Sequence, residues 1–295
     1  MTIIADSGST KTDWTVTGPC EKKLSTQGLN PVLMTEEQMT SILRCELLPQ
    51  MEDLGCMKVA QEDNDEKLSV FFYGAGVRPE MEEKMSFVLQ SVFQPLSRKI
   101  EVSAASDLLG AARALCGHNE GIACILGTGA NSCLYNGRFI VGNTPALGYI
   151  LGDEGGGAAL GKAFLNALFK GGLPETMRDD YLKQSGLTLE DIIRKVYREP
   201  MPNRFLASTS LYIGAHISHP GLRQIVTENF RLFLRRNVKP YNRPDLPVSF
   251  VGSIASHYEQ LLCEAAQKEG FILGKIMKSP IEGLVEYHHG QILSC

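Results

Sequence analysis

One pattern that occurs twice is the feature that most constrains the fold of this chain. Thr2–Ala5 is a short apolar run and Thr12–Thr17 alternates with period two, while the turn-forming sequence Asp6–Lys11 lies between them. This combination predicts a β-hairpin. The pattern then starts again, because the apolar run Gly121–Leu126 is followed by a glycine-rich turn and a second predicted strand, Asn131–Tyr135. Each half continues into helices and further strands, so we interpret the sequence as an internal repeat.

Apolar spacing and turn residues predict the remaining elements. In the first half we expect strands at Glu21–Gln27, Leu68–Tyr73 and Lys99–Ser103, and helices at Glu36–Leu48, Pro79–Phe93 and Asp107–Leu115. In the second half we expect strands at Phe139–Gly142 and Pro247–Val251, and helices at about 155–170, 175–185, 188–198, 203–217, 221–238, 253–268 and 280–293. The repeat predicts two domains, 1–115 and 116–295, with the last helix packing back on the first.

Composition excludes several classes of protein. The chain has 295 residues, and its 29 Lys and Arg against 33 Asp and Glu give a net charge of −4, which argues against a nucleic-acid or anionic-membrane binder. No window approaches the ~18 consecutive apolar residues of a membrane span, and the start has no basic, apolar leader. The eight cysteines include no Cys-x-x-Cys pair, which predicts reduced thiols and a cytoplasmic protein. We expect His288 and His289 to lie on a solvated helix face.

The first glycine-containing turn resembles a phosphate loop only in part. Asp6–Thr12 lacks the Walker A spacing, and it leads into a strand where a Walker A loop would open a helix. What the residues support is a hairpin turn whose N–H groups and hydroxyls can surround a phosphate, with Asp6 placed to bind Mg²⁺ directly or through water. An ordinary polar hairpin is the alternative. Gly127–Gly129 is the counterpart turn of the second half, and Val248–Ser253 is a strand that ends in Gly-Ser at a helix start.

At these three segments the chain resembles the N-acetylglucosamine kinases and the related BadF/BadG/BcrA/BcrD ATPases of the sugar kinase/heat-shock protein 70/actin superfamily. Asp6–Thr12 resembles the first phosphate motif, Ile125–Ser132 the second and Val248–Ala255 the adenosine motif. The most diagnostic segment is Gly148–Gly155, which reads Gly-Tyr-Ile-Leu-Gly-Asp-Glu-Gly. The resemblance covers essentially the whole chain. It implies an α/β fold of two ribonuclease H-like (actin-like ATPase) domains, each a mixed sheet with flanking helices, around a central cleft.

The resemblance also implies roles for individual residues. Asp107 matches the base that takes the proton of the sugar hydroxyl, although an N-cap is the alternative from position alone. Asn30 matches a sugar-binding asparagine, with an Asn-Pro turn as its alternative, and Asp153 is either a ligand of sugar hydroxyls or a capping acid. The expected substrate-binding residues are Asn30, Asp107, Ala130, Asn131, Gly148 and Asp153. The expected ATP- and phosphate-binding residues are Ser7, Gly8, Ser9, Thr10, Lys11, Gly127, Thr128, Gly129, Gly252, Ser253 and Ser256, with Asp6 on the metal; Lys11 is otherwise an exposed hairpin lysine.

The sequence departs from these relatives in three places that concern the ligands. Ile125 and Leu126, and not an acid, precede the second loop, which leaves Asp6 as the clearer metal ligand. Ser7 and Ser9 stand in the first loop where many relatives have glycines. Ala146 and Leu147 precede Gly148 where the kinases have a Gly-Trp pair, which leaves the wall of the sugar pocket, and therefore the substrate, open.

The function implied is an ATP- and Mg²⁺-dependent kinase that phosphorylates the 6-hydroxyl of N-acetylglucosamine or a related amino sugar, as a homodimer. Two alternatives stay open. One is a BadF/BcrA-type ATPase that activates a partner enzyme through a [4Fe–4S] cluster, for which Cys116, Cys124 and Cys133 are the nearest trio but lack the usual spacing. The other is a relative that binds sugar or nucleotide without turnover.

Overall fold

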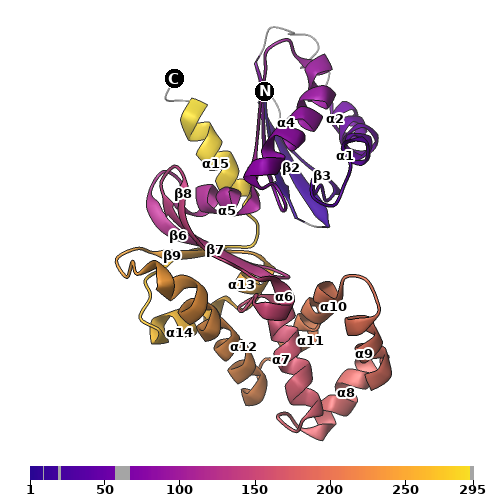
Figure 1. The fold of residues 1–295 in the computed structure, drawn as a ribbon, viewed down its shortest axis with the longest axis vertical. Coiled ribbons are helices and arrows are strands. Elements are labelled where there is room, and N and C mark those ends of the chain that lie inside the picture. Colours follow the sequence, from indigo (N-terminus) through magenta and orange to yellow (C-terminus); the bar gives the residue numbers. More distant parts are fainter. Residues whose placement is uncertain (9, 19–20, 57–66, 293–295) are drawn as a thin grey trace. The chain divides into compact units, whose positions relative to one another are not determined.

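The structure is a computed structural model that describes residues 1–8, 10–18, 21–56 and 67–292. The chain divides into two compact units. Unit 1 contains Met1–Gly117 together with the C-terminal segment from Pro280, and unit 2 contains His118–Ser279. Figure 1 shows the elements of each unit, coloured along the sequence. No helix among the described residues is long and apolar enough to cross a bilayer.

Unit 1 is built on a mixed five-stranded sheet in the order β3-β2-β1-β4-β5. The hairpin predicted from the first turn is present, because β1 and β2 pair antiparallel with Ile3 opposite Val16. β3 extends the antiparallel side, whereas β4 and β5 are parallel to β1. The strands are β1 (Thr2–Ser7), β2 (Lys11–Thr17), β3 (Lys22–Gln27), β4 (Leu68–Gly74) and β5 (Ile100–Ser106).

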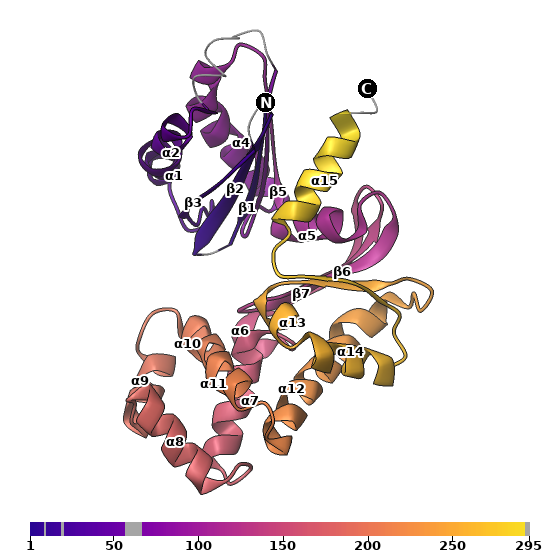
Figure 2. The same ribbon diagram turned by 180° about the vertical axis from the view of Figure 1, so that it is seen from behind.

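Helices cover both faces of this sheet because its strands alternate apolar residues on both sides. Ile3 and Ala5 of β1 belong to a core formed with α1 and α4, and Ile4 belongs to a second core formed with α5 and α15. Figures 1 and 2 show α15 beside α5 in both views. The helical elements of unit 1 are α1 (Glu36–Ile42), a π-helical segment (Leu43–Leu47), α2 (Leu48–Asp53), α4 (Pro79–Phe93), a 3₁₀ turn (Gln94–Leu96), α5 (Asp107–Cys116) and α15 (Ile281–Ile292).

Unit 2 repeats the same sheet. Its order is β10-β9-β6-β7-β8, with β6, β7 and β8 antiparallel in turn and with β9 and β10 parallel to β6. This equivalence confirms the internal repeat that the sequence predicts, and each unit is a mixed sheet with flanking helices as expected. The strands are β6 (Glu120–Leu126), β7 (Ala130–Asn136), β8 (Ile140–Thr144), β9 (Val248–Val251) and β10 (Leu273–Met277).

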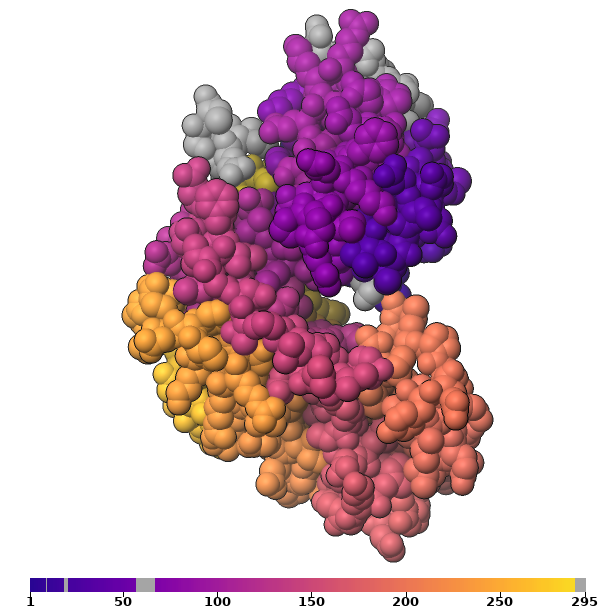
Figure 3. Space-filling view, in the orientation of Figure 1, coloured from indigo at the N-terminus to yellow at the C-terminus, as the bar shows by residue number. Residues whose placement is uncertain are grey.

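Most of the helices of unit 2 lie between β8 and β9. Figure 3 shows the segment α8–α10 (salmon to coral) at the surface of this unit. Phe164, Phe230 and Phe233 are fully buried where these helices pack on the sheet. The helical elements are α6 (Gly148–Leu151), α7 (Gly157–Phe169), α8 (Glu175–Ser185), α9 (Leu189–Tyr197), α10 (Pro202–Ser208), α11 (Ser210–Ala215), α12 (Pro220–Phe233), a π-helical segment (Leu234–Val238), a 3₁₀ turn (Lys239–Tyr241), α13 (Ser253–His257) and α14 (Glu259–Lys268).

The structure corrects the sequence prediction at several elements. β10 was not predicted, because Gly274 and Lys275 interrupt its apolar pattern; it forms since Ser249 of β9 accepts a hydrogen bond from the Lys275 N–H. The expected single helices at 203–217 and 253–268 are each two helices, which meet at Thr209 and at Tyr258.

The prediction for the two adjacent histidines is wrong for one of them. His289 is exposed, but His288 is buried. The His288 ring stacks on Phe71 with 3.7 Å between centroids, and its Nε2 lies 2.8 Å from the Tyr73 hydroxyl. The reason is tertiary: α15 packs against the sheet of unit 1, so one face of this terminal helix is interior.

Candidate functional site

The candidate site of unit 1 forms where the parallel strands end. Ser7, Gly74 and Ser106, the last residues of β1, β4 and β5, lie in one row of the sheet. The first loop follows β1, and α5 follows β5. Because the carboxyl ends of parallel strands meet at the same edge, this edge is where a ligand of an open α/β sheet is expected.

Asp6 lies one row before that edge, on the face of the sheet that α5 and α15 cover. Its neighbour Ile4, two residues earlier and therefore on the same face, packs in the core formed with these helices. Burial, then the negative charge of Asp107 and then that of Asp13 raise the pKa of Asp6 to about 7. Asp6 and Asp107 therefore interact electrostatically within this unit.

Asp107 is the first residue of α5, and the cap of that helix is a different residue. Ser106 is the N-cap, since its hydroxyl accepts a hydrogen bond from the Leu109 N–H at 3.2 Å. One carboxylate oxygen of Asp107, Oδ1, accepts the Leu108 N–H at 2.8 Å. The N-cap alternative for Asp107 is therefore wrong. Burial raises the pKa of Asp107, against the effect of backbone hydrogen bonds.

The first loop uses its serine differently from what the sequence suggests. The Ser7 hydroxyl is fully buried and lies 2.7 Å from the Thr12 hydroxyl. It also accepts the Leu29 N–H at 3.0 Å, so only the backbone of Ser7 is left for a phosphate. Gly8 and Thr10 are exposed, and the Lys11 ammonium lies 2.6 Å from Asp13. Ser9 lies outside the described residues.

Gly28 brings a second segment against this loop. A Cβ on Gly28 would lie 2.8 Å from the Thr10 nitrogen and 2.9 Å from the Lys11 nitrogen, so only glycine permits this approach. The segment continues into Asn30, whose Oδ1 accepts the Val32 N–H at 3.0 Å and forms an Asx turn. Its side chain also packs against the backbone of Gly76. The turn interpretation of Asn30 is thus correct, and it leaves the Nδ2 amide as the group that can bind a ligand.

The carboxylates of unit 1 fit a magnesium ion in charge and donor type. Mg²⁺ prefers oxygen ligands and usually takes one or two carboxylates together with waters and substrate phosphates. The raised pKa values of Asp6 and Asp107 show that ionising both is costly here, and a divalent cation offsets that cost. No cluster of three or more His, Cys, Asp or Glu side chains that could hold a metal occurs in the described part of the chain.

The second loop, in unit 2, is a backbone structure. The Gly127 N–H donates to the Gly129 carbonyl at 3.0 Å, which closes the turn between β6 and β7. The first turn of α7 is bonded to this loop, because the Gly157 N–H donates to the Gly127 carbonyl at 2.8 Å. A Cβ on Gly156 would lie 2.7 Å from the Gly129 carbonyl carbon. The exposed Thr128 side chain lies at the tip.

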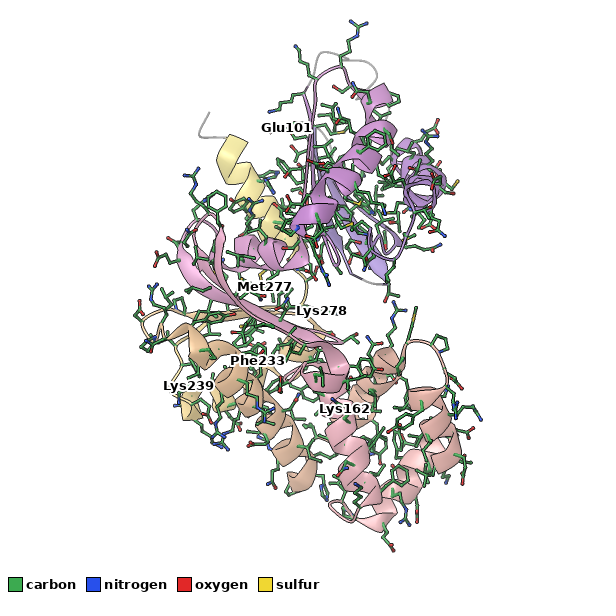
Figure 4. The ribbon with its side chains drawn as sticks, in the orientation of Figure 1. Glu101, Lys162, Phe233, Lys239, Met277 and Lys278 are labelled. Atoms are coloured by element: carbon green, nitrogen blue, oxygen red, sulfur yellow. The ribbon has the colours of Figure 1, made fainter. Side chains whose placement is uncertain are left out.

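Asp153 is attached to the same loop. Its Oδ1 accepts the Ala130 N–H at 3.3 Å, and a Cβ on Gly129 would lie 2.8 Å from its Oδ2. The residue has φ 57°, a left-handed conformation that Asp tolerates better than most side chains. Burial raises its pKa, against the hydrogen bond from Ala130 and the charge of Lys162 on α7, which Figure 4 labels. Asp153 is thus fixed to the second loop, and it does not cap α7, whose N-cap is Gly156.

The remaining expected residues of unit 2 lie around these loops. Asn131 is the second residue of β7, and its Oδ1 accepts from the Ser132 N–H and from the Asn143 amide. Gly252 follows β9 as the N-cap of α13 with φ 128°, and a Cβ there would lie 2.7 Å from the Leu126 carbonyl carbon and 3.2 Å from the Gly127 nitrogen. The adenosine-motif residues are thus adjacent to the second loop. Ser253 and Ser256 are on α13, and Gly148 begins α6.

Sequence reasoning missed residues that support these loops. Gly28 and Gly156 hold neighbouring segments close to the two turns, and Asp13 lies directly opposite Asp6 across β1 and β2. The run Gly155–Gly157 was a usable signal for a close approach, since three successive glycines are unusual at a helix start. Asp13 has no such signal, because its importance depends on the strand register.

Solved structures resemble this chain over its full length. A protein of Porphyromonas gingivalis with the provisional name N-acetylglucosamine kinase is 46% identical, and the match covers 99% of this chain and 100% of that one with a TM-score of 0.90. A Chromobacterium violaceum protein with the same provisional name is 16% identical over 97% of this chain and 98% of that one, with a TM-score of 0.70.

An MreB protein of Spiroplasma citri, solved with bound AMPPNP, is 11% identical over 99% of this chain and 97% of that one, with a TM-score of 0.55. This match and the Chromobacterium one concern the fold alone, whereas the Porphyromonas protein is a relative in sequence as well. No protein-family model and no curated protein matches the chain.

Proposed function

The chain belongs to the N-acetylglucosamine kinase-like family of the sugar kinase/heat-shock protein 70/actin superfamily, and we propose that it phosphorylates the 6-hydroxyl of N-acetylglucosamine or of a related amino sugar. As a member of this family it is an ATP-dependent sugar kinase. The amino sugar and the position of the hydroxyl are our proposal, and so are the roles of the residues below.

The observation that carries the proposal is the position of Asp107. Ser106 caps α5, so the carboxylate of Asp107 is not needed for that purpose. It lies at the carboxyl edge of the parallel strands and interacts with Asp6. A carboxylate with a raised pKa is a better proton acceptor than an ordinary aspartate once it is ionised, which suits a general base.

The residues described above have distinct roles in the proposed reaction. Asp107 accepts the proton of the sugar hydroxyl, whose oxygen forms the new bond to the γ-phosphorus of ATP while the bond from that phosphorus to the bridging oxygen breaks and ADP leaves. Asp6 would hold Mg²⁺, which neutralises charge on the phosphates. Backbone N–H groups and Thr128 of the second loop would bind phosphate oxygens, and Asn30 and Asp153 would bind sugar hydroxyls.

A coupled assay tests this proposal. The protein is incubated with ATP, Mg²⁺ and one of N-acetylglucosamine, N-acetylmannosamine, glucosamine or glucose, and ADP release is followed. We expect N-acetylglucosamine or another amino sugar to give the highest kcat/KM, and phosphorus NMR of the product to show a 6-phosphate. Chelation of Mg²⁺ should abolish turnover. Glucose as the best acceptor would contradict the proposed substrate class.

The ATPase-activator alternative has no observation in its favour among the described residues. Cys124 and Cys133 are fully buried in β6 and β7 of unit 2, whereas Cys116 ends α5 of unit 1. A protein purified without oxygen that contains stoichiometric iron would revive this alternative. We retain the homodimer as an expectation, which sedimentation velocity can test.

A further inference from the structure

The charged side chains of unit 1 continue beyond Asp6 along the hairpin. Asp13 of β2 is directly opposite Asp6 in the antiparallel register, and directly opposite residues project from the same face of a sheet with Cβ atoms about 4.5–5.5 Å apart. Lys11 lies two residues before Asp13 and therefore also projects from that face. The Lys11 ammonium is 2.6 Å from the Asp13 carboxylate.

Helices α5, which begins with Asp107, and α15 cover this face of the sheet. Lys23 of β3, on the same face, pairs with Glu282 of α15 at 3.0 Å, and Asp107 at the start of α5 acts on Asp6 from the same side. Four charged side chains thus lie along this face of the sheet, in the order Asp107, Asp6, Asp13 and Lys11. Asp13 lies between Asp6, the proposed metal ligand, and Lys11, which begins β2 directly after the first loop.

The ion pair of Lys11 and Asp13 contributes too little to the stability of the folded protein to explain its presence. The side chains of Lys11 and Asp13 are 59% and 38% exposed, and exposed ion pairs contribute little to stability because solvent screens them. The ion pair restricts the Lys11 side chain to one orientation. A lysine side chain has four rotatable bonds and samples many rotamers when nothing holds its ammonium.

We propose that Asp13 is a positioning residue for phosphoryl transfer: it holds the Lys11 ammonium over the face that carries Asp6, where Lys11 meets the phosphates of the nucleotide. This inference rests on the proposed function, since it assumes a nucleotide at the first loop. Asp13 itself does not touch the phosphates, which its charge would repel. The benefit is orientation, and misplacement of a charged group by about 1 Å can cost up to 10²-fold in rate.

The orientation role has a kinetic signature that a merely structural role lacks. Asp13→Asn removes one negative charge beside the loop, so attraction for the phosphates does not fall. We expect nucleotide affinity, measured by calorimetry without sugar, to stay within about threefold of wild type or to tighten, while kcat falls about tenfold. Lys11→Met should lower both. In the Lys11→Met background Asp13→Asn should have no further effect on kcat, because the two residues act as one unit.

The chain offers a matched control in the same sheet. Lys67 and Glu101 also form a pair at 2.6 Å, with side chains 64% and 56% exposed. Glu101, labelled in Figure 4, lies in the row of Thr2 at the opposite end of the parallel strands. Glu101→Gln removes one carboxylate charge from a similar pair, and we expect it to leave kcat and nucleotide affinity unchanged. Asp13→Glu, which keeps the charge, should recover part of the kcat lost in Asp13→Asn.

The measurement is made on transfer to the amino sugar and, separately, on transfer to water without sugar. If kcat of Asp13→Asn equals that of Glu101→Gln, or if the Asp13 and Lys11 effects multiply, the positioning role is overturned while the proposed kinase stands. If ATP is hydrolysed but no amino sugar is phosphorylated, the proposed function fails and the variants still decide the role of Asp13 from hydrolysis. A wild-type protein that transfers phosphate to neither acceptor overturns both.

Discussion

Unit 1 and unit 2 share one strand order but differ at the equivalent turn. In unit 1 the pair one row before the end of the first strand is Asp6 opposite Asp13. In unit 2 the equivalent pair is Ile125 opposite Asn131. The first unit therefore places two carboxylates on the paired strands beside its loop, whereas the equivalent strand positions of the second unit carry no charge and its one adjoining carboxylate, Asp153, comes from a later segment. The comparison teaches that a repeated strand order can carry different side-chain chemistry at equivalent positions.

The largest effect on kcat should come from a carboxylate of unit 1, Asp107. Asp107→Asn keeps the oxygen that accepts the Leu108 N–H, so folding and ATP binding should be retained, but an amide cannot accept the hydroxyl proton. We expect kcat to fall about 10²–10⁴-fold in the coupled assay. Ser106→Ala is the control, because it removes the cap of the same helix. It should lower the free energy of unfolding by about 1 kcal/mol and leave kcat nearly unchanged. An active Asp107→Asn enzyme would contradict the role of Asp107 as the general base.

Nucleotide binding by the second loop, in unit 2, should be sensitive to one methyl group added at Gly156. In Gly156→Ala the new Cβ would meet the Gly129 carbonyl carbon at 2.7 Å, so the second loop must shift. Overpacking of this kind costs about 1–3 kcal/mol, and if it falls on the loop, nucleotide affinity drops about tenfold or more by calorimetry. Gly142→Ala of β8 is the control, since its Cβ would meet nothing closer than 3.5 Å. Equal affinities for the two variants would show that the loop does not bind the nucleotide.

A smaller effect separates the turn role of Asn30 from its proposed role toward the sugar. Asn30→Asp keeps the oxygen that accepts the Val32 N–H, and it replaces the Nδ2 donor with a negatively charged carboxylate oxygen. We expect KM for the sugar to rise about tenfold, as for loss of one hydrogen bond to a ligand, while KM for ATP and the melting temperature change little. Asn30→Ala is less informative because it also removes the turn. An unchanged sugar KM in Asn30→Asp would leave the turn as the only role.

The smallest effect concerns an ion-pair cluster on the helices of unit 2. Glu269 accepts hydrogen bonds from Arg235 at 2.8 Å and Arg231 at 2.7 Å. The bond from Arg235 is the largest cause that lowers the pKa of Glu269; burial opposes it, and the bond from Arg231 and the two arginine charges lower the pKa further. Glu269→Gln should therefore destabilise the protein at pH 7, by at most about 1 kcal/mol because such pairs are screened by solvent.

The pH dependence fixes the sign of this last prediction. The pKa of Glu269 is lower in the folded state than its unfolded value of about 4.3, so its stabilisation is complete above that value and is lost as pH falls through the folded-state pKa. Urea unfolding followed by circular dichroism should show a difference between wild type and Glu269→Gln at pH 7 that shrinks as the pH falls below the unfolded-state pKa of Glu. A difference that does not change with pH would mean packing, not charge.

Periodicity and turn residues were enough to predict most elements. The two hairpins follow from apolar runs that flank Gly-containing turns, and helix Pro79–Phe93 begins where its proline indicates. Shorter elements that depend on neighbours were not predictable: β10 forms because β9 offers it an edge and the Ser249 hydroxyl accepts the Lys275 N–H. The break between α10 and α11 lies at Thr209, whose hydroxyl donates to the Leu206 carbonyl at 2.7 Å.

The sequence alone determined the repeat, the two loops and the candidate residues, because these depend on residue type and on neighbours along the chain. Only the tertiary structure decided what each side chain is free to do. Strand register placed Asp13 opposite Asp6, the hydroxyl of Ser7 became buried beside Thr12, and the cap of α5 proved to be Ser106 and not Asp107. The packing of α15 made His288 interior. The physical reason is that residue type leaves several local partners open, as at the start of α5, and that the burial of Ser7 and His288 is set by Leu29 and Tyr73, which are distant in sequence.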